Sequence, residues 1–281
     1  MTEWRPPICL TSQHHKERAL QRPFRWGLGA ELAVCRCDTD QLGSFSGEVE
    51  RPADALETCR RKARLGLEQT GLPVGLASEG SFGPHPAVPL LAMGEELLVY
   101  IDLERNLELV ERRLELRTNH SQQRFGPGDD LAGWLQQVGF PSHGVIARPE
   151  HWRRGDPVFK GLRCATELEQ AVASCRAADP AGRILLESDM RAHQNPTRMA
   201  SIARLGMALV RRLRTPCPHC ELPGWGLQDT RAGLPCSWCG EPTELTLEEL
   251  WGCPHCGKTS PQPRRDGLMT ADPGQCSWCN P

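Results

Sequence analysis

Four Cys-x-x-Cys pairs between Cys217 and Cys279 constrain the fold of this chain more than any other feature of its sequence. The same two tetrapeptides occur twice, in the order Cys217-Pro-His-Cys220, Cys236-Ser-Trp-Cys239, Cys253-Pro-His-Cys256 and Cys276-Ser-Trp-Cys279. The pairs of each half are separated by 15 and then 19 residues, a spacing that lets two pairs close one tetrahedral four-thiolate zinc site. The duplication predicts two tandem zinc ribbons, residues 214–247 and 248–281, with two structural Zn2+ ions. Whether the ligands pair within each ribbon or cross between the ribbons stays open.

A disulfide framework is the alternative interpretation of eight cysteines in a small domain. The N-terminal residues show no basic start leading into an apolar stretch, and no apolar run is long enough for a membrane span. We therefore expect a cytoplasmic protein, because in reducing surroundings closely paired thiols are metal ligands more often than disulfides. A segment this short buries too little apolar surface to fold alone, so the metal supplies much of its folding free energy.

The charge of the cysteine-rich tail bears on its partner. The whole chain has 33 basic and 35 acidic residues, and from Leu213 onward five basic residues stand against eight acidic ones. Nucleic-acid binding leaves a basic footprint that neutralises phosphates, so we expect a protein partner for the ribbons rather than nucleic acid. The tail's tryptophans are expected to form its small apolar core beside the zinc, although exposed indoles would stack on bases; they are Trp225, Trp238, Trp251 and Trp278.

Residues 1–213 alternate apolar runs with helical patterns, which predicts an α/β domain with a central mixed sheet flanked by helices. Expected strands cover residues 8–11, 31–36, a short one at 76–77 ending at 78–80, a hairpin of 96–103 with 107–117, then 143–148 and 183–187. Expected helices cover residues 14–24, 52–71, 129–138, 166–177 and 195–213. A capping box at Thr166 and an N-cap at Asn195 are expected to open the last two helices.

The turn from Thr11 to Lys16 leaves a strand and enters a helix. Backbone N–H groups, the hydroxyls of Thr11 and Ser12, the His15 imidazole and the Lys16 ammonium converge where an anion would bind. This arrangement suits a phosphate. The alternative is an ordinary helix start with a solvated lysine.

Three acidic segments complete the candidate site. Glu57 and Lys62 lie in one predicted helix, where Glu57 would hold Mg2+ and Lys62 a phosphate, or where Glu57 merely forms exposed ion pairs with Arg60 or Arg61. Glu79 is expected at the carboxyl end of a strand, the edge at which open α/β sheets bind ligands. Acidic residues at Asp38, Asp40 and Glu48 add a polar loop nearby in sequence.

The segment from Asp189 to Arg198 packs an acid, two guanidiniums and an imidazole around a helix start. Arginine is the side chain best matched to bidentate phosphate contacts. We therefore consider Arg191, His193 and Arg198 as anion ligands. The alternative is a salt-bridged connector that fixes the last helix.

Three of these segments, in the same order, resemble the inosine/xanthosine triphosphate pyrophosphatase family. That family's Thr-x-Asn-x-x-Lys loop is similar to Thr11 through Lys16, with Gln13 in place of Asn. Its Glu-Asn-Ala-x-x-Lys-Ala helix is similar to Glu57 through Ala63, and its Ala-Asp-Asp-Ser-Gly to Leu76 through Gly80. A Ser-His-Arg segment that contacts the base has its counterpart at His193 or Arg198. The whole chain also resembles an uncharacterised bacterial family that joins such a domain to C-terminal knuckles.

The resemblance implies a nucleotide pyrophosphatase-like domain that binds, and hydrolyses, a nucleoside triphosphate or related phosphorylated ligand with Mg2+. It implies catalytic roles for Glu79, Glu57 and Asp189. The phosphate ligands would then be Thr11, Ser12, His15, Lys16, Lys62, Arg191, His193 and Arg198. The alternative hypothesis is a non-catalytic scaffold whose zinc ribbons dock a partner.

Overall fold

A computed structural model describes residues 7–37, 54–84 and 92–281. These residues form two compact units. The first unit contains the described residues up to Asn106 and those from Val110 to Ala208, and the second contains Leu107–Leu109 and Leu209–Pro281. Within these ranges, we find no helix with both the length and the apolar character that a membrane crossing requires.

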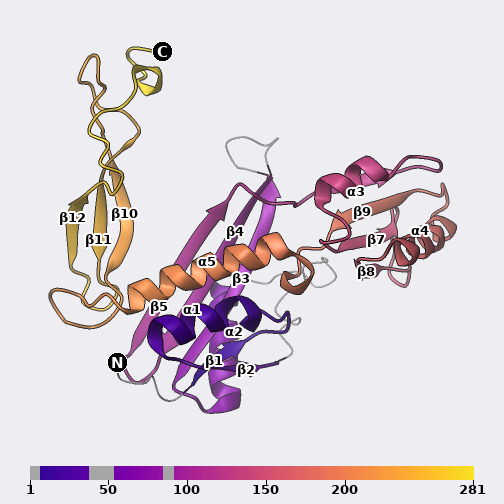
Figure 1. Cartoon of the computed structure of the whole chain (residues 1–281), viewed down its shortest axis with the longest axis horizontal. Coiled ribbons are helices and arrows are strands. Elements are labelled where there is room, and N and C mark those ends of the chain that lie inside the picture. Colours follow the sequence, from indigo (N-terminus) through magenta and orange to yellow (C-terminus); the bar gives the residue numbers. More distant parts are fainter. Residues whose placement is uncertain (1–6, 38–53, 85–91) are drawn as a thin grey trace. The chain divides into compact units, whose positions relative to one another are not determined.

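The first unit is built around a central mixed sheet with the strand order β2-β1-β3-β4-β5 (Figure 1). β1 pairs in parallel with both of its neighbours, and β3 pairs antiparallel with β4. The predicted central mixed sheet is thus confirmed. The strands are β1 (Ile8–Thr11), β2 (Leu32–Cys35), β3 (Val74–Pro84), β4 (Ala92–Asp102) and β5 (Leu107–Glu115).

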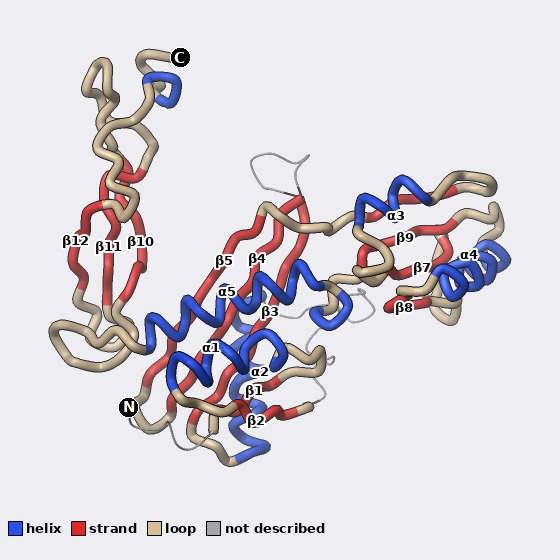
Figure 2. The backbone as a smooth tube through the Cα atoms, viewed as in Figure 1, coloured by secondary structure: helices blue, strands red, loops and turns tan. Residues whose placement is uncertain are grey.

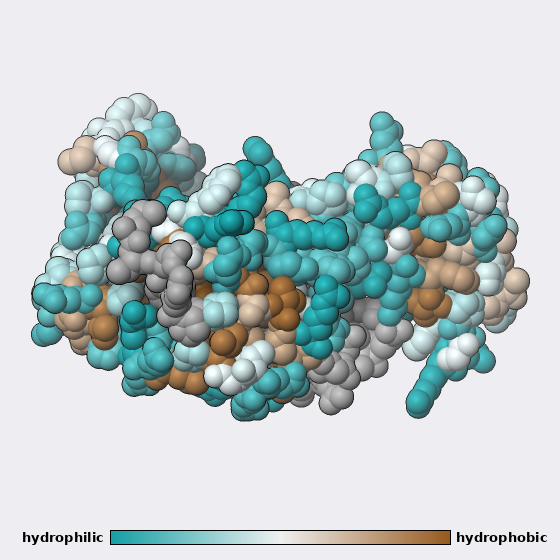
Figure 3. All heavy atoms as spheres, turned by 60° about the horizontal axis from the view of Figure 1, so that its bottom comes forward, coloured by the Kyte–Doolittle hydropathy of each residue, from teal (hydrophilic) through white to brown (hydrophobic). Residues whose placement is uncertain are grey.

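Helices cover both faces of this sheet (Figure 2). α2 (Ala55–Thr70) packs on one face, where Cys59, Ala63 and Leu67 form a cluster with Ala77 and Val99. α5 (Pro196–Leu213) lies on the opposite face. Its Arg198 bonds to Glu96 of β4, and Glu96 is an odd number of residues from Val99, so its side chain points away from the α2 face. α1 (Glu17–Leu28) packs against α5 at Gly206, where an added Cβ would lie 2.7 Å from Leu20 Cδ2. The face seen in Figure 3 is largely hydrophilic, with hydrophobic residues exposed in small areas.

β3 is longer than the sequence indicates. We expected the strand to end at 78–80 and residues 83–86 to be irregular, but the ladder with β4 continues to Pro84↔Ala92. β1 pairs with β3 only as far as Thr11↔Ala77. Glu79 therefore lies inside a strand rather than at its carboxyl end, although it stands just beyond the last residue paired with β1.

A second sheet in the first unit has the order β6-β9-β7-β8. β7 (Val145–Pro149) and β9 (Ile184–Ser188) match predicted strands, whereas β6 (Gln122–Phe125) and β8 (Phe159–Leu162) were not predicted. β6 shows only one buried residue, Phe125, so it carries little apolar signal. α3 (Ala132–Val138) and α4 (Ala165–Ala178) pack on this sheet around Trp134 and Leu168. The capping box was wrong, since α4 begins one residue before Thr166 and its N-cap is Cys164.

The N-cap predicted at Asn195 is confirmed, because the Arg198 backbone N–H donates to Asn195 Oδ1 at 3.0 Å. A short 3-10 helix, η2 (Ala192–Gln194), precedes it.

The second unit contains a three-stranded antiparallel sheet in which β11 is central. Its strands are β10 (Gly226–Ala232), β11 (Thr246–Gly252) and β12 (Thr259–Pro263), and η3 (Pro273–Gln275) follows them. Each strand connects one Cys-x-x-Cys pair to the next along the chain. Because neighbouring strands run in opposite directions, the chain delivers successive pairs to alternate ends of the sheet.

Candidate functional site

The eight tail cysteines gather into two clusters, in each of which the four sulfurs lie within 4.8 Å of one another. Site 1 consists of Cys217, Cys220, Cys253 and Cys256, and site 2 of Cys236, Cys239, Cys276 and Cys279. All fourteen cysteines of the chain are free thiols. The disulfide interpretation of the tail is therefore wrong.

The sulfur geometry fits a tetrahedral metal. Four thiolates at the usual zinc–sulfur distance stand about 3.8 Å apart. In site 1 the Cys217–Cys256 and Cys220–Cys253 sulfur pairs measure 3.7 and 3.6 Å, and the two corresponding pairs of site 2 measure 3.9 and 3.7 Å. Four thiolates close each site completely, so a Zn2+ ion held there would be structural and would have no open position for a substrate.

The pairing crosses between the two halves of the tail. The tandem interpretation joined Cys217 and Cys220 to Cys236 and Cys239, whereas the structure joins them to the third pair. Pairs with the same tetrapeptide sequence thus share a site. The antiparallel sheet is the physical reason, since it brings the first and third pairs to one end and the second and fourth pairs to the other.

Three of the four Cys-x-x-Cys turns, here called knuckles, share one local geometry. In the first three, the N–H of the leading cysteine donates to the carbonyl five residues later, at 2.8 Å for both Cys217 and Cys236. The residue after the second cysteine takes a left-handed backbone in these knuckles, with φ of 62° at Glu221 and 75° at Gly240. Glycine adopts this conformation without steric cost, so the glycines that follow Cys239 and Cys256 are part of the knuckle pattern.

In the first unit, charged side chains cluster around the point where β1 ends. Lys16 is only 7% exposed, and its Nζ donates to the Ser78 carbonyl at 2.6 Å. The last β3 residue paired with β1 is Ala77, directly before Ser78. The Lys16 ammonium therefore lies next to the carboxyl end of β1. The Lys16 N–H also lies 3.3 Å from Ser12 Oγ, which accepts its hydrogen bond.

Two ion pairs, one partly buried and one fully buried, flank this point on opposite faces of the sheet. On the α2 face, Lys62 Nζ lies 2.6 Å from Glu79 Oε2, and the Glu79 side chain is 3% exposed. On the α5 face, Arg198 Nε lies 2.5 Å from Glu96 Oε1, and both side chains are 1% exposed. The Arg198 guanidinium also donates to the Met190 carbonyl. Five charged groups therefore meet at the edge where open α/β sheets bind ligands.

Gly80 makes room for the Arg198–Glu96 pair. A Cβ added at Gly80 would lie 2.4 Å from Arg198 Nη2 and 3.0 Å from Glu96 Oε2. We expect Gly80→Ala to lower the free energy of unfolding by about 1–3 kcal/mol, because the buried guanidinium must move. Urea denaturation measures this effect. Gly83→Ala is the matched control in the same strand, since its Cβ meets nothing within 4 Å among the described residues; equal losses for both variants would contradict the explanation.

Three imidazoles line the loop beside Lys16. The ring centroids of His14 and His193 are 5.2 Å apart, and those of His15 and His193 are 5.8 Å apart. Burial, together with the positive charge of Lys16 and weaker contributions from neighbouring cations, lowers the pKa of His14 to about 3. Burial and the charge of Arg198 lower the pKa of Lys16 to about 8, against the opposing effect of Glu79.

The remaining predicted residues are placed as follows. Thr11 is buried with its hydroxyl toward α2, where a Cβ at Gly66 would lie 2.0 Å from Oγ1. Arg191 forms a bidentate pair with the fully buried Asp189, with Nη2 2.6 Å from Oδ2. Glu57 pairs with Arg61 at 3.0 Å, and both side chains are at least one-third exposed. Asp38, Asp40 and Glu48 lie outside the described residues.

The sequence pattern of a family described as a domain of unknown function (DUF6671) matches residues 62–281. The chain belongs to this family. No curated protein and no solved structure matches the sequence or fold of this chain. The DUF6671 segment contains Lys62, Glu79, Glu96 and Arg198 together with all eight cysteines of sites 1 and 2, whereas Lys16 precedes it.

The sequence did not reveal Glu96 as a member of the charged cluster of this DUF6671 protein, or His14 as an imidazole beside it. Its patterns predict Glu96 as the first residue of a hairpin strand and His14 as the start of a helix. The available signal was an acidic residue directly before the apolar run Leu97–Ile101, because a carboxylate that is buried with such a run requires a partner. Nothing in the sequence indicated that this partner is Arg198, which is 102 residues away.

Proposed function

We propose that the first unit binds a phosphorylated ligand, such as a nucleoside triphosphate with Mg2+, at the carboxyl end of β1. Cationic or polar donors converge there from four segments. Lys16 comes from the β1–α1 loop and Lys62 from α2, while His193 precedes α5 and Arg198 lies in it. A phosphate offers several acceptor oxygens, which suits donors that arrive from separate elements.

The observation that supports this proposal best is the excess of positive charge and hydrogen-bonding groups around the β1–α1 loop. The charges of Lys16, Arg191 and Arg198 all act on His14 in the direction that disfavours its protonation. The Nδ1 atom of His193 is buried and makes no hydrogen bond with the described residues. A bound anion would relieve the repulsion among these cations and supply the missing partner.

Hydrolysis is the finer part of the proposal. Phosphoryl chemistry depends on positioning and on neutralising charge. In this proposal Glu79 holds Mg2+ or orients the attacking water, since its carboxylate is the acidic group closest to Lys62. Glu57 would assist at the metal, and Asp189 would orient Arg191. A non-catalytic scaffold is the alternative, and it is favoured by the carboxylates that already neutralise Lys62, Arg198 and Arg191.

The test is a panel of canonical and deaminated nucleoside triphosphates with Mg2+, followed by pyrophosphate release and thermal shift. We expect the wild-type protein to be stabilised by at least one triphosphate, and Glu79→Gln to lose about 100-fold or more in turnover. Thermal stabilisation by a triphosphate without turnover would support ligand binding and exclude hydrolysis. Neither turnover nor a thermal shift with wild-type protein would overturn the proposal.

The pH dependence of binding provides a second check. The ammonium of Lys16 loses its charge as the pH rises through about 8, whereas an ordinary lysine stays charged to about 10. Affinity for the triphosphate should therefore fall as the pH rises through about 8. Lys16→Met should bind more weakly below that pH and lack this step. An identical pH profile in the variant would exclude Lys16 as a ligand.

A further inference from the structure

Two tryptophans of the tail stand in solvent at site 2. Trp238 is 80% exposed and Trp278 is 78% exposed. Each directly precedes the second cysteine of its Cys-Ser-Trp-Cys knuckle, so both flank the same four-thiolate centre. The expectation that they form the apolar core of the tail was wrong for these two residues.

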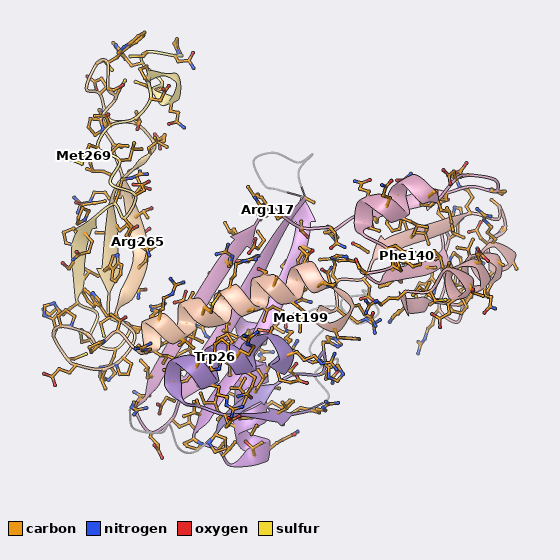
Figure 4. The ribbon with its side chains drawn as sticks, viewed as in Figure 1. Trp26, Arg117, Phe140, Met199, Arg265 and Met269 are labelled. Atoms are coloured by element: carbon orange, nitrogen blue, oxygen red, sulfur yellow. The ribbon has the colours of Figure 1, made fainter. Side chains whose placement is uncertain are left out.

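Met269 is a third exposed apolar side chain, two residues from a segment that pairs with site 2. Met269, labelled in Figure 4, is 79% exposed. It lies two residues before Ala271, which forms a β-bridge with Cys236 of site 2. The Ser237 N–H donates to the Ala271 carbonyl at 3.0 Å and fixes this segment beside the first tryptophan-bearing knuckle.

Site 1 differs from site 2 in the kind of residue that it exposes. Its knuckles carry the exposed imidazoles of His219 and His255 where those of site 2 carry indoles, and its two neighbouring tryptophans are covered. His219 occupies the position in its knuckle that Trp238 occupies in site 2. The centroid of its ring lies 6.1 Å from that of Trp225. Trp225 itself is 8% exposed. Trp251, the other tryptophan near site 1, is partly buried beneath the Arg265 guanidinium at 5.6 Å. The tryptophans near site 1 are thus buried or partly buried, whereas those of site 2 stand in solvent.

The backbone beneath the exposed rings is held in place. The Trp238 N–H donates to Cys236 Sγ at 3.4 Å, and the Asn280 N–H donates to the Cys276 carbonyl at 2.8 Å. A metal ion bound by the four thiolates would fix both knuckles further. Tryptophans on a fixed backbone have only two side-chain torsions to lose on binding, and tryptophan is among the residues enriched at the positions that dominate interface affinity.

The charge around site 2 indicates what covers these rings. In residues 233–247 and 264–281 four acidic residues stand against two arginines. Arg264 is paired with Asp266 and Arg265 with Glu249, which leaves the exposed Glu241 and Glu244 and the cap residue Asp272. Four thiolates around a divalent ion add a net charge of about minus two. This surface repels phosphates and attracts cations.

We propose that Trp238, Trp278 and Met269 form a docking surface for a basic segment of a partner protein. Lysine or arginine side chains of the partner would lie over the indole rings, where cation–π attraction and contact with the aliphatic stems both contribute. The neighbouring carboxylates would select cationic segments and reject nucleic acid. This surface is independent of the phosphate site proposed for the first unit.

The experiment titrates the full zinc-loaded chain with a synthetic peptide of alternating lysine and leucine, observing the indole N–H resonances by NMR. We expect the resonances of Trp238 and Trp278 to shift, and the affinity to weaken by at least about tenfold in Trp238→Ala/Trp278→Ala. Trp26→Ala is the matched control, because Trp26 is 70% exposed on α1 (Figure 4) and should have no effect on binding. A glutamate–leucine peptide should not bind.

Three outcomes would overturn the proposal. They are shifts of Trp26 alone, equal affinity of the double variant and wild type, and tighter binding of oligothymidylate than of the basic peptide. The last would make the surface a stacking platform for nucleic acid. Zinc content and far-UV circular dichroism verify that the double variant is folded, and the wild-type resonance shifts provide the decisive measurement if it is not.

Discussion

Serine at Cys217, Cys220, Cys253 and Cys256 together should leave about one zinc ion per chain, because these four thiols form site 1 and site 2 keeps its full ligand set. Serine at Cys217, Cys220, Cys236 and Cys239 should leave almost none, because each site then loses half of its thiolates. Both variants remove the same number of cysteines from the same tail, so total thiol content cannot explain a difference. Elemental analysis after gel filtration measures the zinc directly.

Pairing within each half would reverse this result. The second variant would keep Cys253, Cys256, Cys276 and Cys279 as one complete ribbon, and the first variant would keep no complete site. Chelation of the wild-type protein provides the accompanying stability measurement. Zinc bound in these sites would supply much of the folding free energy of so small a unit, so we expect its removal to abolish the near-UV circular dichroism of the tail tryptophans.

Arg198→Ala should lower the free energy of unfolding by about 3–5 kcal/mol, because it leaves the Glu96 carboxylate buried without its cation. Both side chains of this pair are 1% exposed, so water cannot replace the lost partner. The variant also loses the hydrogen bond from the guanidinium to the Met190 carbonyl. Equilibrium denaturation in urea measures the difference.

Two controls separate burial from the loss of a charge as such. Arg61→Ala breaks the exposed pair with Glu57 and should cost about 0.5 kcal/mol or less. The double replacement Glu96→Leu/Arg198→Met should cost less than Arg198→Ala, because it leaves no buried charge unpaired. Equal losses for Arg61→Ala and Arg198→Ala would show that burial of the ion pair does not determine its contribution.

The sequence predicted the existence of helices and strands in the first unit more reliably than the residues at which they end. Asn195 and Pro196 placed the start of α5 correctly, since side-chain capping and a fixed φ act within a few residues. The end of β3 was misjudged because Gly80 and Gly83 look like turn residues, whereas pairing with β4 keeps both in the strand. That pairing partner lies outside the local window, so a local pattern does not reveal it.

The candidate sites divide in the same way. The spacing of the cysteines identified every member of sites 1 and 2, because a Cys-x-x-Cys pair is a local signal. The crossed pairing follows from the antiparallel sheet between the knuckles, although the matching tetrapeptides of Cys217 and Cys253 did carry a hint of it. Lys62 with Glu79 and Lys16 with Ser78 depend on how α2 and the β1–α1 loop pack against β3, which the sequence does not state.

The alternation of knuckles along β10, β11 and β12 also sets the order in which the tail can fold during synthesis. When Cys239 leaves the ribosome, each site has only half of its ligands, and site 1 first becomes complete with Cys256. Site 2 waits for Cys279. A nascent tail therefore holds thiols without their full set of partners until nearly all of it has been made, and site 1 can close before site 2.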